Sequence, residues 1–169
     1  FFGLDKNTGE LVWWSRRGVG PPFLKDSSMS TPWVATHGNQ RVFYAGTGCG
    51  NIVCVNLRDG TPLWRYQVSK GGVNSSPLIF GDKLIGIHGR ENLDSTEIGR
   101  MFAIQLPKDY KKTGGEVDAK QGGAPRLPQD VEVWRAGLEM FTSSPVLDKG
   151  RVYQVTKTGD LVCLEAEND

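Results

Sequence analysis

Polar and charged side chains gather in one stretch of the chain, between residues 88 and 100. The stretch combines carboxylates and an amide with a histidine and two arginines: His88, Arg90, Glu91, Asn92, Asp94, Glu97 and Arg100. Carboxylate and amide oxygens are the ligands that Ca²⁺ prefers, so a calcium site is one interpretation. Because the spacing does not fit an EF-hand loop, we favour a hydrogen-bonded polar loop, assign no metal ligand, and treat the stretch as a candidate binding loop.

The rest of the sequence carries no recognisable catalytic arrangement. Neither G-x-S-x-G nor H-E-x-x-H occurs, and the only two histidines, His37 and His88, fall in a turn and a loop. Cys49, Cys54 and Cys163 are too few and too irregularly spaced for a disulfide framework or a zinc site. We therefore predict no catalytic residue. We expect Cys54 and Cys163 to occupy small buried positions between sheets and Cys49 to be the most exposed thiol.

The polar stretch and the cysteines belong to a sequence unit that occurs several times in the chain. Three triplets each precede an apolar run, a turn with glycine and a second apolar run: Ser30-Thr31-Pro32, Ser75-Ser76-Pro77 and Ser143-Ser144-Pro145. The segments Gly50–Asn56 and Gly159–Glu165 then match each other, and Gly99–Gln105 matches them loosely. Self-similarity at a spacing of about 45 residues indicates a repeat architecture.

Each unit reads as four short strands separated by turns, because its apolar runs are rich in Val, Ile, Phe, Tyr and Trp and are bounded by Gly, Asn and Asp. The predicted fold is an all-β propeller of four-stranded antiparallel blades, with about three to three and a half blades in this chain. We expect residues 1–17 to end one blade, 30–68 and 75–136 to form two blades, and 143–169 to form an incomplete one. The second of the two carries an insertion at 107–130, rich in Gly and Pro, which we expect to be flexible surface.

The amino-acid sequence of the repeat resembles that of a known family. Asp5-Lys6-Asn7-Thr8-Gly9-Glu10-Leu11-Val12-Trp13 resembles the D-x-x-T-G-x-x-x-W signature of the PQQ-like β-propeller repeat, and Asn56–Trp64 is a degenerate copy. The family includes quinoproteins and the lipoprotein scaffold of outer-membrane protein assembly. The resemblance implies that Trp13, Trp64 and Trp134 dock structurally against the adjacent blade and hydrogen-bond through the indole N–H.

In this architecture the first strand of each blade lines a central channel, and the three triplets open these strands. Hydroxyl, amide and ammonium groups there are candidates for binding a small polar ligand: Lys25, Ser30, Lys70, Asn74, Ser75 and Ser143. The alternative is that Ser and Thr satisfy backbone groups at the starts of strands.

The quinone after which the repeat is named gives a second functional hypothesis. The quinoprotein alcohol dehydrogenases that the repeat resembles carry an adjacent Cys-Cys pair, a Ca²⁺ site and an Asp base, whereas this sequence has no Cys-Cys and no Asp assignable by motif. We therefore expect a non-catalytic propeller without cofactor, acting as a binding or interaction scaffold. The alternative is part of a PQQ-dependent dehydrogenase that uses PQQ and Ca²⁺.

Composition limits the partners. With 20 basic and 19 acidic residues the net charge is +1, which offers no electrostatic footprint for nucleic acid. No apolar run is long enough to span a membrane. We expect a protein partner or a small polar ligand, with missing blades supplied by the rest of a longer chain or by a second copy. The resemblance implies a periplasmic or exported bacterial protein.

Overall fold

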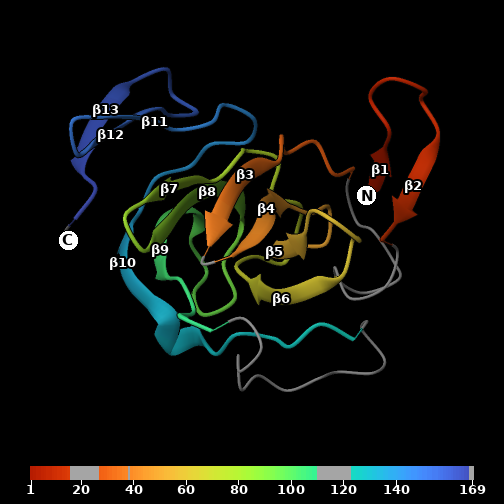
Figure 1. Cartoon of the computed structure of the whole chain (residues 1–169). Coiled ribbons are helices and arrows are strands. Elements are labelled where there is room, and N and C mark those ends of the chain that lie inside the picture. Colours follow the sequence, from red (N-terminus) through yellow and green to blue (C-terminus); the bar gives the residue numbers. More distant parts are fainter. Residues whose placement is uncertain (16–26, 38, 110–122, 168–169) are drawn as a thin grey trace.

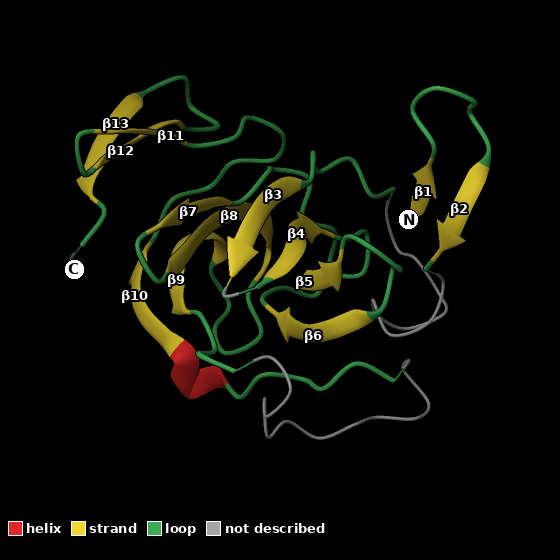
Figure 2. Cartoon of the chain, viewed as in Figure 1, coloured by secondary structure: helices red, strands yellow, loops and turns green. Residues whose placement is uncertain are grey.

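The structure, a computed structural model, describes residues 1–15, 27–37, 39–109 and 123–167, and these form short antiparallel strands in four sheets (Figures 1 and 2). The first sheet contains β1 (Phe2–Leu4) and β2 (Leu11–Trp14). The second contains β3 (Trp33–His37), β4 (Gln40–Gly46), β5 (Asn51–Asn56) and β6 (Pro62–Gln67). The third contains β7 (Leu78–Phe80), β8 (Lys83–Glu91), β9 (Ile98–Gln105) and β10 (Glu132–Ala136). The fourth contains β11 (Val146–Asp148), β12 (Arg151–Val155) and β13 (Leu161–Glu165).

Each sheet is a simple meander in which consecutive strands pair, and a 3₁₀ turn, η2 (Gln129–Val131), precedes β10. The succession of two, four, four and three strands confirms the predicted all-β fold of four-stranded antiparallel blades. Along the chain the sheets follow one another as layers, with the β1–β2 hairpin at one end and β11–β13 at the other (Figure 1).

The turn chemistry of the repeat explains the tight hairpins. In the first sheet the Asp5 carboxylate accepts hydrogen bonds from the backbone N–H groups of Asn7 (2.8 Å) and Thr8 (2.9 Å), and these bonds lower the pKa of Asp5. Gly9 closes the turn at φ 75°, a conformation that favours glycine. Asn56 and Gly60 repeat the arrangement between β5 and β6, with Gly60 at φ 74°. The motif therefore encodes the connection between the third and fourth strands of a blade.

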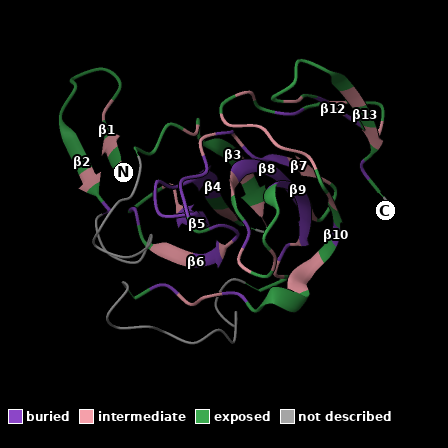
Figure 3. Cartoon of the chain, turned by 180° about the vertical axis from the view of Figure 1, so that it is seen from behind, coloured by how far each residue is buried: buried purple, intermediate pink, exposed green. Residues whose placement is uncertain are grey.

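A hydrophobic layer lies between each pair of successive sheets. Phe43, Val53 and Val55 meet Phe1 and Trp13 of the first sheet. The second layer joins the second and third sheets, and the third layer joins the third and fourth. Figure 3 shows that burial is concentrated in the central strands β4, β5, β8 and β9, whereas the two end sheets are largely exposed. Each sheet is thus stabilised mainly by its neighbours, as in other repeat proteins.

Part of the insertion at 107–130 is ordered, which corrects the expectation of flexible surface. Residues 110–122 lie outside the described part of the chain, but Ala124 and Leu127 are buried, at 1% and 2% exposure. Leu127 packs into the core between the second and third sheets. The segment is held because it returns along the outer edge of β6, where it finds both backbone partners and apolar contacts.

The cysteines also differ from the expectation. Cys54 is buried as predicted, but Cys49 is buried as well, and Cys163 is exposed. The Cys49 sulfur lies 3.1 Å from Thr47 Oγ1 and accepts a hydrogen bond from Asn51 Nδ2 at 3.2 Å, so the β4–β5 turn folds over it. Cys163 occupies the repeat position of Cys54, but within the described residues no further sheet covers its face of β13.

Candidate functional site

Two of the repeat tryptophans make hydrogen bonds to the following sheet. Trp13 Nε1 donates to the carbonyl of Leu57 at 3.0 Å, and Trp134 Nε1 donates to the carbonyl of Ala166 at 3.2 Å. Leu57 and Ala166 hold the same repeat position, directly after the third strand. The Trp13 ring lies against both Gly3 and Gly60, since a Cβ on either glycine would collide with it. These contacts show that Trp13 and Trp134 pack one sheet against the next.

Trp64 departs from this pattern. Its side chain is fully buried, but within the described residues its indole N–H has no hydrogen-bond partner. The next sheet carries Leu106 at the acceptor position, and Pro107 and the insertion follow in place of the short turn. The inserted segment therefore changes the junction between the second and third sheets.

The Ser-Thr/Ser-Pro triplets form a chain of hydrogen bonds that links three sheets. Thr31 N–H donates to Ser76 Oγ, and Ser76 N–H donates to Ser144 Oγ, both at 2.9 Å. Ser75 Oγ donates to the carbonyl of Ser143 at 2.9 Å. In the structure these residues bond backbone groups at the starts of strands, which is the alternative role considered for them above.

The other candidates at the strand starts differ: Ser30 and Ser143 are hydrogen-bonded within the protein, and Ser143 Oγ also accepts from Gln154 Nε2 at 2.6 Å. Ser30 Oγ accepts from the N–H of Gly46 at 2.9 Å, and Ser143 Oγ donates to the carbonyl of Val155 at 3.1 Å. Lys70 is exposed, and Asn74 Oδ1 is buried without a partner among the described residues. Lys25 lies outside the described residues.

The candidate binding loop is a hairpin with a buried amide at its base. β8 and β9 are longer than their counterparts, and Asn92 is fully buried between them. Its Nδ2 donates to the carbonyls of Glu97 (2.9 Å) and Gly99 (3.3 Å). The carbonyl of Glu91 also accepts from the N–H of Lys70 at 3.0 Å, which ties the hairpin to the second sheet. The loop is therefore a braced element of defined shape.

A carboxylate joins this hairpin to the outermost strand of its sheet. Asp94 Oδ1 accepts from Arg100 and Oδ2 from Arg135, each at 2.7 Å. These bonds hold the pKa of Asp94 well below its usual range and raise the pKa of Arg135. Arg135 also pairs with Glu132. A polar pocket of ≈ 350 Å³ opens beside the network, lined by Asp94, Ser95, Thr96, Glu97, Gly99, Arg100, Arg135, Ala136 and Gly137.

His88 and Arg90 lie deeper in the same hairpin. His88 is 1% exposed, and burial, with Arg100 as a second cause, lowers its pKa to about 4. The N–H of Arg90 donates to His88 Nδ1 at 3.3 Å, which places the proton of the neutral ring on Nε2. The Arg90 guanidinium lies 4.4 Å from the ring centre of Phe141, a cation–π contact with the segment before the fourth sheet.

The sequence identified most of this network but missed Arg135. The residue lies far from the loop along the chain and belongs to no motif. One signal could have found it: Arg135 follows Trp134 as Arg65 follows Trp64, and so occupies the same repeat position.

No group of three or more His, Cys, Asp or Glu side chains suited to a metal ion gathers in the described part of the chain. Of the helices in those same residues, none is long and apolar enough to cross a membrane.

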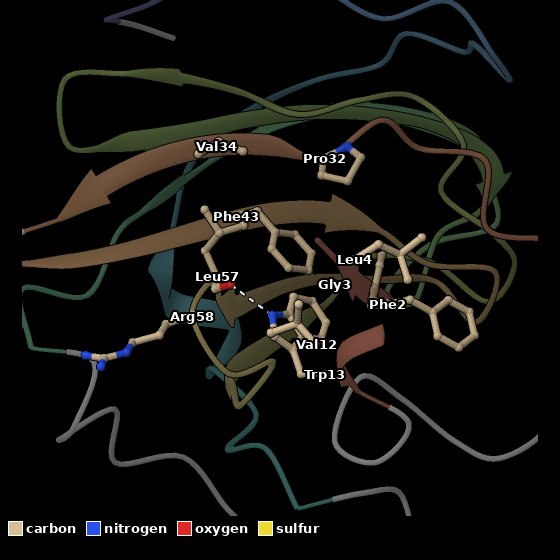
Figure 4. Close-up of a pocket in the computed structure, with 11 residues that line it drawn as sticks. Phe2, Gly3, Leu4, Val12, Trp13, Pro32, Val34, Phe43, Leu57 and Arg58 are labelled. Carbon is tan, nitrogen blue, oxygen red and sulfur yellow. Dashed lines mark hydrogen bonds between the residues drawn. The ribbon is translucent and has the colours of Figure 1, made fainter. Parts of the chain in front are cut away.

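A second pocket, of ≈ 360 Å³, is apolar and lies between the first two sheets (Figure 4). On the side of the second sheet the pocket is lined by Phe43 and Pro32. These residues face Trp13, Leu4 and Phe2 on the opposite side. In the described residues the first sheet consists of β1 and β2 alone. The pocket lies in the layer in which Phe1 and Trp13 pack against Phe43, so we interpret it as a feature of packing between these sheets.

Comparison with known proteins identifies both family and fold. The family model described as "Outer membrane protein assembly factor BamB" matches residues 2–99, more than half of the chain. Among solved structures, the crystal structure of BamB from Moraxella catarrhalis superposes with a TM-score of 0.60 at 18% sequence identity, covering 98% of this chain and 42% of that one. This chain thus spans less than half the length of that BamB. The computationally designed Ika4 protein gives a TM-score of 0.39 at 9% identity, covering 90% of this chain and 99% of its own, which is too low to support an argument. No curated protein matches the sequence.

Proposed function

Because the chain belongs to the family of outer membrane protein assembly factor BamB, we propose that it is a non-catalytic binding scaffold of the bacterial cell envelope. Family membership is the observation that carries the proposal. The partner that fits it best is a protein, since the family is named for a role in protein assembly. A periplasmic or exported location is part of the same proposal.

The geometry of the β8–β9 hairpin supports a scaffold role. Asn92 and Asp94 brace the hairpin by hydrogen bonds to its own backbone and to two arginines, so its exposed tip is presented in one shape. A preorganised polar surface loses little conformational entropy when a partner binds. Thr96 and Glu97 at the tip are exposed and would make the first contact.

The decisive experiment is site-specific photocrosslinking of the full-length protein in its bacterial host. A photoreactive residue replaces Thr96 at the hairpin tip. In the matched control it replaces Lys6, an exposed residue in a turn at the other end of the strands. We expect a discrete protein adduct in the envelope fraction from position 96 and much less from position 6.

The quinoprotein alternative is tested on the same purified protein. If the chain is a scaffold without cofactor, PQQ with Ca²⁺ leaves its melting temperature unchanged. A saturable rise in melting temperature with both added, or the absence of any adduct from position 96, would contradict the proposal.

A further inference from the structure

The outer edge of β6 carries an additional extended segment of the same chain. Outermost strands present unpaired backbone groups, which proteins usually cover or protect. Here the N–H of Arg65 donates to the carbonyl of Pro125 at 2.9 Å, and the N–H of Leu127 donates to the carbonyl of Arg65 at 2.8 Å. The pairing is parallel, centred on Arg65 and Arg126. Gln129 then reaches the carbonyl of Gln67 with its side-chain amide at 3.1 Å.

The equivalent strand of the third sheet, β10, has the same edge without the segment. Trp64 pairs with Cys54, and Trp134 pairs with Ala103, the residue at the same repeat position. In an antiparallel ladder, alternate residues turn their backbone N–H and C=O groups away from the partner strand. The backbone groups of Arg135 therefore point outward, as those of Arg65 do.

Nothing in the described ranges covers this edge of β10. The strand pairs only with β9, and the isolated bridges of the described chain lie elsewhere. The two arginines also differ in exposure: Arg65 is 1% exposed, whereas the Arg135 side chain is 50% exposed.

The polar pocket of ≈ 350 Å³ lies where a bound segment would continue. Its lining includes Gly137, which has the repeat position of Gln67, the residue whose carbonyl receives the Gln129 amide. The pocket also contains Ser95, whose buried Oγ has no hydrogen-bond partner among the described residues. Its charges, from Asp94, Glu97, Arg100 and Arg135, are balanced, which suits an uncharged hydrogen-bonding side chain.

We propose that the outer edge of β10 binds an extended segment of a partner protein, parallel to β10, with an amide or hydroxyl side chain in the pocket. The Arg135 backbone makes the two hydrogen bonds that Arg65 makes with residues 125 and 127, and the side chain two residues further on reaches Gly137. Addition of a strand to a free edge is a general mode of peptide recognition. The inference rests on the proposed scaffold function and specifies where and how the scaffold binds.

The chain itself supplies the probe. An acetylated and amidated peptide of residues 123–129, Gly-Ala-Pro-Arg-Leu-Pro-Gln, is titrated to millimolar concentration into the ¹⁵N-labelled full-length protein. We expect the backbone amide signals of Arg135 and Gly137 to shift saturably, because the corresponding site on β6 is already occupied. Absence of any shift in β10 at the highest concentration would overturn the proposal.

Chemical variants of the peptide test the hydrogen bonds. N-methylation at Leu127 removes the N–H that would donate to Arg135, whereas N-methylation at Arg126 removes one that points away from the strand. Loss of one hydrogen bond predicts about tenfold weaker binding for the first peptide and little change for the second. Equal weakening of both would refute the parallel pairing.

A protein variant tests the other hydrogen bond. Arg135→Pro removes the outward N–H, which an edge strand tolerates, and Arg135→Ala is the matched control that loses only the side chain. We expect binding to weaken about tenfold more in the first than in the second. If the peptide fails to bind while crosslinking from position 96 persists, the edge proposal is wrong and the scaffold function stands. If crosslinking alone is lost, the scaffold function fails.

Discussion

At the residue scale, the long β8–β9 hairpin contains a buried histidine that folding keeps neutral. His88 is enclosed between the second and third sheets, and Arg100 lies opposite it on β9. Burial and this positive charge both disfavour the protonated ring, and its Nε2 is without a hydrogen-bond partner in the described residues. The residue therefore contributes to structure and makes stability depend on pH.

The first prediction concerns that dependence. The pKa of His88 is 6.5 when unfolded and about 4 when folded, so between these values the unfolded state binds more protons. The free energy of unfolding should fall as pH drops from 6.5 towards 4, by up to about 3 kcal/mol, and this contribution should stay constant above that range. Urea denaturation at a series of pH values measures it. The slope should shrink in His88→Gln and persist in His37→Gln; an unchanged slope in His88→Gln would refute the assignment.

At the element scale, two elements differ in length from their counterparts in the other repeats. The β8–β9 hairpin and the insertion before β10 are both longer than their counterparts, and both contact the second sheet. The hairpin does so through the N–H of Lys70, and the insertion through the backbone of Arg65. Each longer element therefore reinforces the junction at which Trp64 makes no hydrogen bond within the described residues.

The hairpin depends on one amide. Asn92→Ala would leave the carbonyls of Glu97 and Gly99 without their side-chain donor in a buried setting, at a cost of about 1–3 kcal/mol. Chemical denaturation should report the loss, and hydrogen exchange should accelerate in residues 92–99. Glu91→Ala, an adjacent exposed position, is the control and should change little. Equal effects in both variants would argue against bracing by Asn92.

The inserted segment depends on one apolar side chain. Leu127→Ala removes a side chain that is 2% exposed in the core between the second and third sheets, which should lower the free energy of unfolding by about 2–4 kcal/mol. Asp130→Ala, a nearby exposed position, should change it by less than about 0.5 kcal/mol. Similar, small effects in both variants would show that the segment is not part of the cooperative core.

At the scale of the whole molecule, four sheets are joined by contacts between neighbours. In such a stack the sheets can differ in their local free energy of unfolding. When one sheet unfolds, its neighbour loses only the hydrophobic layer that the two share. The β1–β2 hairpin is the clearest case, because a two-stranded hairpin is marginal by itself and this one is held by Phe1 and Trp13 against Phe43.

Local opening of that hairpin is the corresponding prediction. Trp13→Ala removes both the stacking on Phe43 and the hydrogen bond to Leu57, so amides of β1 and β2 should lose protection from hydrogen exchange. Protection of β8 and β9 should persist, since they lie two sheets away. Leu11→Ala, at a position 57% exposed, is the control. Loss of protection throughout the chain would instead indicate a single cooperative unit.

The sequence by itself determined the fold, because the repeat is local. Glycine at positive φ, Asx side chains in tight turns and alternating apolar runs specify hairpins without reference to distant residues, so the strands and their grouping into blades could be read directly. The polar hairpin at 88–100 was recognisable for the same reason: its residues are contiguous.

Only the tertiary structure decided what each polar group does. The triplet serines bond to other sheets, Cys49 lies under its own turn, and residues 123–130 pair with β6. The partners of the triplet serines and of the inserted segment are far away in sequence, and the burial of Cys49 depends on how its own turn folds. Arg65 and Arg135 share one repeat position, yet one is covered and the other half-exposed. The local sequence pattern determines where strands and turns form. Whether a side chain is buried, and what it bonds to, depends on which distant segment packs beside it in the assembled sheets.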